Sequence, residues 1–190
     1  VFTKTAKGFI SGNTSSEVIG KVQFGITGSG TTTAGVSWKV NNSMVVNYMS
    51  AHDNNTLWDK LLLSNPDDSE ADRVKMNKLG AAIIMISKGM PFIHAGEEML
   101  RTKDGEENSY KSSDAINNID WSVLKEGSIQ YETMKYYQGL IEMRKAYDIF
   151  RSTTGLIVVN AKMLDNGAME VTFRSNISSD KAIVIIKWYF

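Results

Sequence analysis

Apolar positions along the chain predict alternating strands and helices. The run 44–51 is mostly apolar without strict alternation, which is typical of a strand buried on both faces of a parallel sheet. From Ser69 onward apolar residues recur at helical spacing until Gly89, which ends the predicted helix. Residues 90–95 indicate a second short buried strand. These elements together predict a strand, helix, strand unit with parallel strands.

The second half of the chain predicts one more helix and three further strands. Residues 129–147 place a partly apolar row along one flank of a helix, comprising Met134, Tyr137, Leu140, Ile141 and Arg144. Three strand-like segments follow, separated by turns such as Asp165-Asn166-Gly167, and they lie at 156–159, 168–174 and 182–186.

Two polar stretches predict loops. Residues 1–43 are rich in Gly, Ser, Thr and Asn, and we expect them to be mostly loop. The segment 103–121 is polar and long for a connection inside a compact domain, which favours a binding role.

Composition excludes several classes of protein. Twenty-one basic and 21 acidic residues leave no net charge, so we expect neither nucleic acid nor a membrane surface as a partner. No apolar run approaches the ~18 residues of a membrane span. The absence of cysteine excludes a disulfide framework, a thiol nucleophile and a Cys-ligated zinc site, but it does not decide the compartment.

The junction after the first predicted strand carries the most chemistry. The apolar run ends directly in His52, Asp53 and Asn54, and α/β folds bind their ligands at the carboxyl ends of parallel strands. An Asp-Asn pair after a strand also forms ordinary turns and helix caps. The residues alone leave both interpretations, a ligand site and an ordinary turn or cap, open.

Metal and aromatic candidates are weaker. The group His94, Glu97 and Glu98 fits no zinc signature. Asp104, Glu106 and Asn108 alternate oxygen-bearing side chains that calcium would accept as ligands. A solvated stretch of charged residues explains the same pattern. We therefore predict no metal site and no required cofactor. Trp58 and Trp121 are either sugar-stacking platforms or core residues.

Two sequence blocks resemble a known family. Residues 47–60 read Asn-Tyr-Met-Ser-Ala-His-Asp-Asn-Asn-Thr-Leu-Trp-Asp-Lys, and residues 89–103 read Gly-Met-Pro-Phe-Ile-His-Ala-Gly-Glu-Glu-Met-Leu-Arg-Thr-Lys. The second block continues through Asn-Ser-Tyr at 108–110 to Asp114 and to Ile-Asp-Trp at 119–121. Both resemble segments of type I pullulanases, in glycoside hydrolase family 13 of the α-amylase superfamily. The resemblance covers roughly residues 44–185.

The resemblance implies an α/β fold. Residues 1–150 are expected to form the C-terminal part of a (β/α)8 TIM barrel, and residues 151–190 the beginning of an all-β sandwich domain. A complete barrel needs about 250 residues, and the chain has 190. We therefore expect a C-terminal fragment that lacks the upstream catalytic strands.

The resemblance also implies roles for individual residues. Asp53 matches the third catalytic carboxylate, which stabilises the transition state by accepting hydrogen bonds from the C2 and C3 hydroxyls of the attacked glucose. His52 matches a histidine that donates to the same sugar, and Asn54 either orients Asp53, binds a hydroxyl or caps a helix. Asp114 matches an aspartate that binds the neighbouring glucose. Asn118 replaces the arginine that many relatives carry, so its contact is left open.

The implied activity is retaining hydrolysis of α-1,6 links in pullulan, amylopectin or glycogen. Retaining glycosidases need a nucleophile and an acid carboxylate, and in the family both precede the segment that contains Asp53. Glu17 alone precedes Asp53 here, so we expect the isolated chain to be inactive. An extracellular or cell-surface location is favoured over the cytoplasm. A branching or transglycosylating enzyme and a non-catalytic glucan-binding module remain as alternatives.

Overall fold

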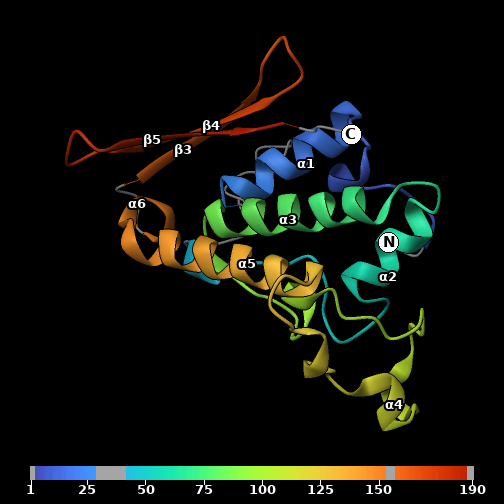
Figure 1. Cartoon of the computed structure of the whole chain (residues 1–190). Helices are drawn as coiled ribbons and strands as arrows, with labels where there is room; N and C mark the ends of the chain where they lie inside the picture. The colour runs from blue at the N-terminus through green and yellow to red at the C-terminus, as the bar shows by residue number, and fades with distance from the viewer. Residues whose placement is uncertain (1–2, 29–41, 153–156, 188–190) are drawn as a thin grey trace. The chain divides into compact units, whose positions relative to one another are not determined.

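The protein has a mixed α/β fold. The computed structural model describes residues 3–28, 42–152 and 157–187 (Figure 1). Its helices are α1 (Ser16–Ile26), α2 (Leu57–Ser64), α3 (Glu70–Ile86), α4 (Asp114–Asn117), α5 (Ile129–Ala146) and α6 (Asp148–Arg151). Its strands are β1 (Val46–Asn47), β2 (Met90–Pro91), β3 (Ile157–Met163), β4 (Met169–Ser175) and β5 (Lys181–Ile186). Short 3-10 helices are η1 (Phe9–Ser11), η2 (Asn42–Met44), η3 (Glu97–Met99), η4 (Ser109–Lys111) and η5 (Trp121–Val123).

The chain divides into two compact units. The first contains Val1–Asn13, Tyr48–Ala81 and Ile93–Leu140, and the second contains Thr14–Asn47, Ala82–Phe92 and Ile141–Phe190. The division falls inside α3 and inside α5. The predicted domains, 1–150 and 151–190, therefore stay a prediction.

The two central strands pair in parallel, as predicted. Val46 lies opposite Met90, and Asn47 lies opposite Pro91. The prediction that they are buried on both faces is wrong, because Val46 is 47% exposed and Met90 is 49% exposed. In the described parts of the chain this sheet contains only β1 and β2, so each strand keeps one unpaired edge.

Two helices, rather than the single one predicted, separate β1 from β2 in the sequence. Helix α2 begins where the Thr56 hydroxyl accepts from the Asp59 N–H at 3.1 Å. Helix α3 begins as predicted, with the Ser69 hydroxyl accepting from the Asp72 N–H at 3.1 Å. Each hydroxyl satisfies a backbone donor that the first helical turn leaves free. The cap of α2, Thr56, lies inside the first of the two resembling blocks, residues 47–60, and the helix that it starts was not predicted.

Arg144 fixes the end of α3 in the second unit. Its side chain is 7% exposed and donates only to backbone carbonyls, namely those of Met85 (2.6 Å), Ser87 (3.1 Å), Phe150 (2.8 Å) and Gly89 (2.7 Å). Burial lowers the pKa of Arg144. A guanidinium remains charged in this setting and offers five donors in one plane. It therefore satisfies carbonyls that α3 leaves free at its C-terminus, where positive charge is favoured.

Gly89 permits β2 to approach β1. Its φ is +107°, and an added Cβ would lie 2.6 Å from the carbonyl oxygen of Val45. The same carbonyl accepts from the Met90 N–H at 2.8 Å, and the Asn47 amide donates to the Lys88 carbonyl at 2.7 Å. Only glycine combines this backbone conformation with so close an approach.

The three predicted C-terminal strands are present, and they form an antiparallel sheet in the order β3-β4-β5 (Figure 1). The inner strand β4 buries alternate residues, and Met169, Val171 and Phe173 are fully buried. Phe173 packs edge-to-face on Phe150 of α6 with ring centroids 5.0 Å apart. The predicted first strand begins at residue 156, which lies outside the described residues.

Helix α1 corrects the prediction that residues 1–43 are mostly loop. The Ser15 hydroxyl caps it, and Lys21 and Glu17 pair at i,i+4. The Gln23 amide donates to the Ala161 carbonyl of β3 at 3.1 Å. The glycines and β-branched residues of α1 have low helix propensity, so the sequence does not predict this helix. Its contact with β3 stabilises it. Residues 1–2 and 29–41 of the predicted loop lie outside the described part.

The first unit has a small apolar core. Leu57, Leu61 and Met76 are buried together, and the partly buried Ile10 and Met49 pack against them. Leu57 and Leu61 lie on α2, Met76 lies on α3, Ile10 lies in η1, and Met49 follows β1. The core therefore joins four parts of the sequence. It places the start of α2, and with it the segment 52–56, on a packed base.

A buried polar network accompanies this core. The Ser50 hydroxyl donates to the Glu97 carboxylate (Oγ to Oε2) at 2.6 Å, and the Tyr137 hydroxyl donates to Asn77 Oδ1 at 2.9 Å. The Asn77 amide donates to the Glu97 carbonyl at 3.2 Å. Glu97 is 5% exposed, and burial raises its pKa to about 7. Burial, Glu97 and Glu98 raise the pKa of Tyr137.

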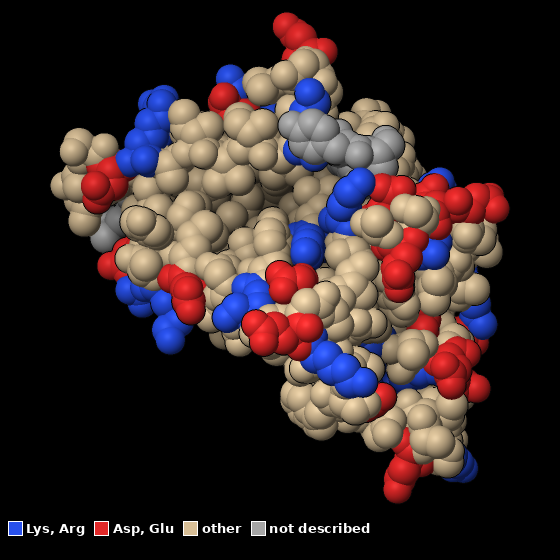
Figure 2. Space-filling view, viewed as in Figure 1, with Lys and Arg blue, Asp and Glu red and all other residues tan. Residues whose placement is uncertain are grey.

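Surface charge is mixed. Figure 2 shows Lys and Arg side chains interspersed with Asp and Glu, in line with 21 residues of each sign. In the part of the chain that the structure describes, no helix has both the length and the apolar character needed to cross a membrane.

Replacing Arg144 should destabilise the protein strongly. A lysine at this position reaches fewer of the four carbonyls, and unpaired buried carbonyls are costly, so R144K should lower the free energy of unfolding by about 3 kcal/mol. Arg151, which pairs with Asp148 on the surface, supplies the matched control: R151K should change stability by less than about 0.5 kcal/mol. Urea unfolding measures both. Equal stabilities of R144K and R151K would contradict the role of Arg144.

Glu97 should make stability depend on pH. Its pKa is 4.5 in an ordinary setting and about 7 in the fold, so the folded state binds the proton more tightly. The free energy of unfolding should therefore fall by about 3 kcal/mol as the pH rises from about 4.5 to above 7. E97Q should remove most of this slope, while the neighbouring E98Q should keep most of it, because burial raises the pKa of Glu97 more than the charge of Glu98 does. Chemical denaturation at a series of pH values tests this, and a wild-type slope retained by E97Q would contradict it.

Candidate functional site

Asp53 lies on an open groove of the first unit. The groove has a volume of about 870 Å3 and is lined by Lys4, Tyr48, Met49, Ser50, Ala51, Asp53, Asn54, Asn55, Leu57, Lys60, Glu107 and Asn108. Three segments supply these walls: the chain start, the stretch that leads into α2, and the loop after η3. The structure thus brings the predicted residues Asp53 and Asn54 together on one concave surface.

His52 and Asp53 are both free to meet a ligand. Their side chains are 87% and 83% exposed, and His52 Nε2 lies 3.6 Å from Asp53 Oδ1. A pair this exposed contributes little to stability. The carboxylate therefore has accessible oxygen atoms for hydroxyl donors.

A tight turn presents Asp53. Asn54 has φ +65°, a left-handed conformation that Asn adopts more readily than most residues. The Asn55 amide then donates to the Gly105 carbonyl at 3.0 Å, which ties the turn to the opposite wall of the groove. On that wall, Lys4 pairs with Glu107 at 2.7 Å. The groove is held open between anchored segments.

The buried carboxylate of Asp59 anchors the chain beyond η3. Asp59 is 2% exposed; its Oδ1 accepts from the Thr102 hydroxyl at 2.5 Å and its Oδ2 accepts from the Lys103 N–H at 2.8 Å. Both oxygens are thus satisfied, as a buried carboxylate requires. Asp59 stands one helical turn after the segment 52–56, so one residue fixes the loop 99–104 against the start of α2.

The long polar stretch predicted as a loop is largely ordered by side-chain contacts. Lys103 donates through Nζ to the Ser109 hydroxyl at 2.8 Å. Arg101 donates to the carbonyls of Ala95, at 3.2 Å, and of Asn117. The Asn117 amide donates to the Ser109 carbonyl at 2.7 Å. Short helices η4, α4 and η5 interrupt the stretch.

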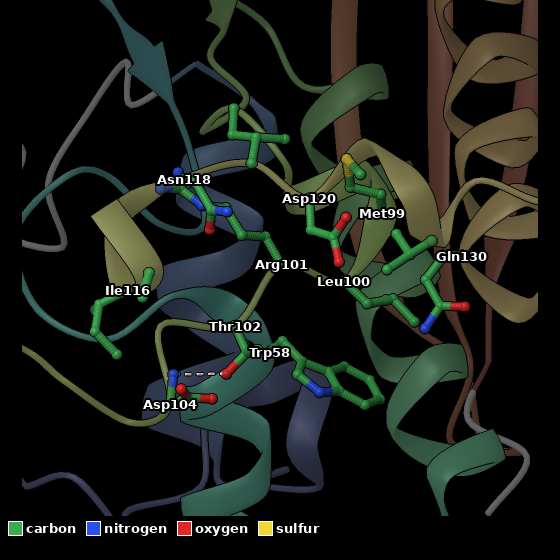
Figure 3. Close-up of a pocket in the computed structure, with 13 residues that line it drawn as sticks. Trp58, Met99, Leu100, Arg101, Thr102, Asp104, Ile116, Asn118, Asp120 and Gln130 are labelled. Atoms are coloured by element: carbon green, nitrogen blue, oxygen red, sulfur yellow. Dashed lines mark hydrogen bonds between the residues drawn. The ribbon is translucent and has the colours of Figure 1, made fainter. Parts of the chain in front are cut away.

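The other predicted residues lie elsewhere. Asn118 lines a separate cavity of about 360 Å3 that also contains Trp58, Arg101, Asp120 and Gln130 (Figure 3). Asp114 is exposed in the first turn of α4 and lines neither the groove nor this cavity. The structure therefore does not bring Asp114 and Asn118 to the groove of Asp53, and their predicted roles are untested.

Burial and nearby positive charges lower the pKa values of His94 and Lys103. Burial lowers the pKa of His94, and the charges of Arg101, Lys103 and His52 lower it further. Burial also lowers the pKa of Lys103, while Asp59 and Asp53 oppose that shift. The lowered pKa favours the neutral imidazole of His94, which can both donate and accept a hydrogen bond.

The acidic loop residues serve local structure. The Glu106 carboxylate accepts from the Asn108 N–H at 2.8 Å, and the Thr102 hydroxyl accepts from the Asp104 N–H at 2.8 Å. Across residues 3–28, 42–152 and 157–187, no three His, Asp or Glu side chains gather as metal ligands would. His94, Glu97 and Glu98 likewise do not form such a group.

Sequence reasoning missed the residues that hold the groove in place. Ser50, Asp59 and Tyr137 were not singled out for a polar role, although Asp59 lies in the resembling block 47–60. A buried carboxylate near a helix start differs from an exposed one only through its tertiary partners, here Thr102 and Lys103. A Thr three residues before Asp59 was the one local signal, because it predicts a cap.

Comparisons with known proteins find relatives named pullulanase and isoamylase. No protein-family model matches the chain. The chain is 40% identical over 150 residues to the pullulanase of Bacillus subtilis, and this covers 79% of the chain and 20% of the relative. It is 35% identical over 81 residues to an isoamylase from a Flavobacterium, covering 43% of the chain and 10% of the relative.

Solved structures give the same answer. The type I pullulanase of Bacillus subtilis, solved with maltose, matches with a TM-score of 0.85 and 33% identity over 97% of this chain and 26% of that one. The pullulanase of Paenibacillus barengoltzii, solved with maltohexaose and α-cyclodextrin, matches with a TM-score of 0.79 and 36% identity over 91% of this chain and 27% of that one. The chain spans about a fifth of the length of its Bacillus subtilis relative. By sequence and by fold, it belongs to the pullulanase family.

Proposed function

We propose that this chain supplies the Asp53 carboxylate to the active site of a debranching glycosidase that hydrolyses α-1,6 links in branched α-glucans. The observation that carries the proposal is the exposed Asp53 carboxylate on a groove, beside the amides of Asn54 and Asn55. Relatives with the same fold were solved with maltose and with maltohexaose. Hydroxyl-rich sugars match a groove lined by carboxylate and amide groups.

Asp53 acts as a transition-state stabiliser in this proposal. Its ionised oxygens accept hydrogen bonds from two hydroxyls of the glucose that is attacked, and such bonds strengthen as the ring becomes oxocarbenium-like. His52, within 3.6 Å of the carboxylate, donates to the same sugar. Asn54 directs the turn, and Asp114 binds the neighbouring glucose.

The proposed fold context explains why Asp53 sits where it does. Strands β1 and β2 pair in parallel and are separated by two helices, which suits two neighbouring strands of a (β/α)8 barrel. Asp53 and the loop 96–103 follow the carboxyl ends of these strands, the side at which barrels place their active sites. The sheet β3-β4-β5 then begins a β-sandwich.

The isolated chain should not hydrolyse pullulan. Retaining hydrolysis needs a nucleophile and an acid about 5 Å apart, and Asp53 is proposed as neither. The resemblance implies that both precede the segment that contains Asp53, where Glu17 is the one acidic residue of this chain. A reducing-sugar assay on the purified chain should stay at background while Bacillus subtilis pullulanase, run beside it, is active. Sugar release by the wild-type chain that D53N abolishes would contradict this division of roles.

A chimera tests the role of Asp53 in catalysis. When this chain replaces the matching segment of Bacillus subtilis pullulanase, the chimera should hydrolyse pullulan. D53N should lower kcat by at least about 100-fold with little change in KM, because the lost bonds are strongest in the transition state. D165N, in the turn between β3 and β4, is the matched control and should stay within about twofold.

The products of the chimera identify the reaction. Linear maltooligosaccharides indicate debranching, whereas new branch points indicate transfer. A chimera that melts cooperatively and keeps its full kcat after the D53N substitution would contradict the proposed role of Asp53.

A further inference from the structure

The cavity beside Trp58 contains hydrogen-bonding groups that the fold does not use. The indole N–H of Trp58 and the side-chain amides of Asn118 and Gln130 make no hydrogen bond to other described residues. The Asp120 carboxylate accepts from the Ser122 N–H through Oδ1 at 2.9 Å and also interacts with the Ser122 hydroxyl, and a carboxylate has acceptor capacity beyond these two contacts. In Figure 3 these side chains surround the cavity from α2, from α5 and from the stretch 118–120.

The cavity walls combine this polar set with apolar surface. The partly buried indole of Trp58 forms one wall, and Met99, Leu100 and Ile116 supply aliphatic surface. A volume of about 360 Å3 falls within the range of small-molecule sites. An aromatic face beside unpaired amides and a carboxylate suits a ring that is apolar on its faces and carries hydroxyls on its edge.

The cavity shares no lining residue with the groove of Asp53. Two consecutive residues at the start of α2 line the two surfaces: Leu57 lines the groove and Trp58 lines the cavity. Consecutive helical residues point in directions about 100° apart. The next residue, Asp59, holds Thr102, which is itself part of the cavity wall.

We propose that this cavity is a second carbohydrate site, which binds one or two glucosyl units of an α-glucan against Trp58 and hydrogen-bonds them through Asp120, Gln130 and Asn118. That the sugar is an α-glucan rests on the proposed function; that the ligand is a neutral, hydroxyl-bearing ring rests on the cavity itself. The site would hold a glucan strand at a distance from the hydrolysed bond, with Trp58 as a platform rather than a core residue.

A residue-resolved NMR titration of the full 190-residue chain with maltotriose separates the two sites. The Trp58 indole N–H signal, assigned by its loss in Trp58→Phe, reports the cavity, and the backbone amides of residues 52–55 report the groove. The indole signal should shift saturably with maltotriose and not with the β-linked cellotriose. Gln130→Ala should weaken that response about fivefold, as expected for one lost hydrogen bond of about 1 kcal/mol.

The outcomes distinguish the cavity from the proposed function. A Trp58 signal that stays still while residues 52–55 respond would overturn the cavity site and leave the function in place. A Trp58 response with silent residues 52–55 would support the cavity and contradict the role of Asp53. An indole shift with unchanged affinity in both Gln130→Ala and Asp120→Ala would also overturn the cavity site, since the binding would then not use its polar groups.

Discussion

The buried carboxylate of Asp59 is the constraint on which both candidate binding surfaces depend. It accepts from the Thr102 hydroxyl and the Lys103 N–H, so the chain after η3 cannot leave the start of α2 without exposing or orphaning a charge. The residues just before Asp59 line the groove of Asp53 and the cavity of Trp58. A single buried side chain therefore links two surfaces that share no lining residue.

Buried polar side chains recur wherever this fold must hold irregular backbone. Ser50 and Glu97 join the two segments that follow β1 and β2 in the first unit. In the second unit Arg144 binds four carbonyls that the end of α3 and its neighbours leave free. Apolar contacts alone do not fix the direction of a loop, whereas a hydrogen bond does. In this chain the hydrogen bonds of these buried polar side chains therefore fix the positions of the loops.

Sequence patterns predicted the elements whose periodicity is local. Helix α3 with its Ser69 cap, helix α5 and the meander β3-β4-β5 follow from spacing and turn residues. Helix α1 and the exposure of Val46 could not be predicted, because the first depends on contact with β3 and the second on which strands lie beside β1. The exposed Asp53 was found through its motif. Asp59 and Glu97 gain their roles from partners 43 to 47 positions away in the sequence, which no local pattern encodes.

The central claim is that Asp53 grips a glucan hydroxyl from a groove that buried charges hold open. A crystal structure of the chain with maltotriose tests it most directly. A pyranose hydroxyl should lie about 2.7 Å from an Asp53 carboxylate oxygen, with the Asp59 contacts to Thr102 and Lys103 intact. Sugar bound only away from this groove, or an Asp53 side chain turned away from bound sugar, would contradict the account.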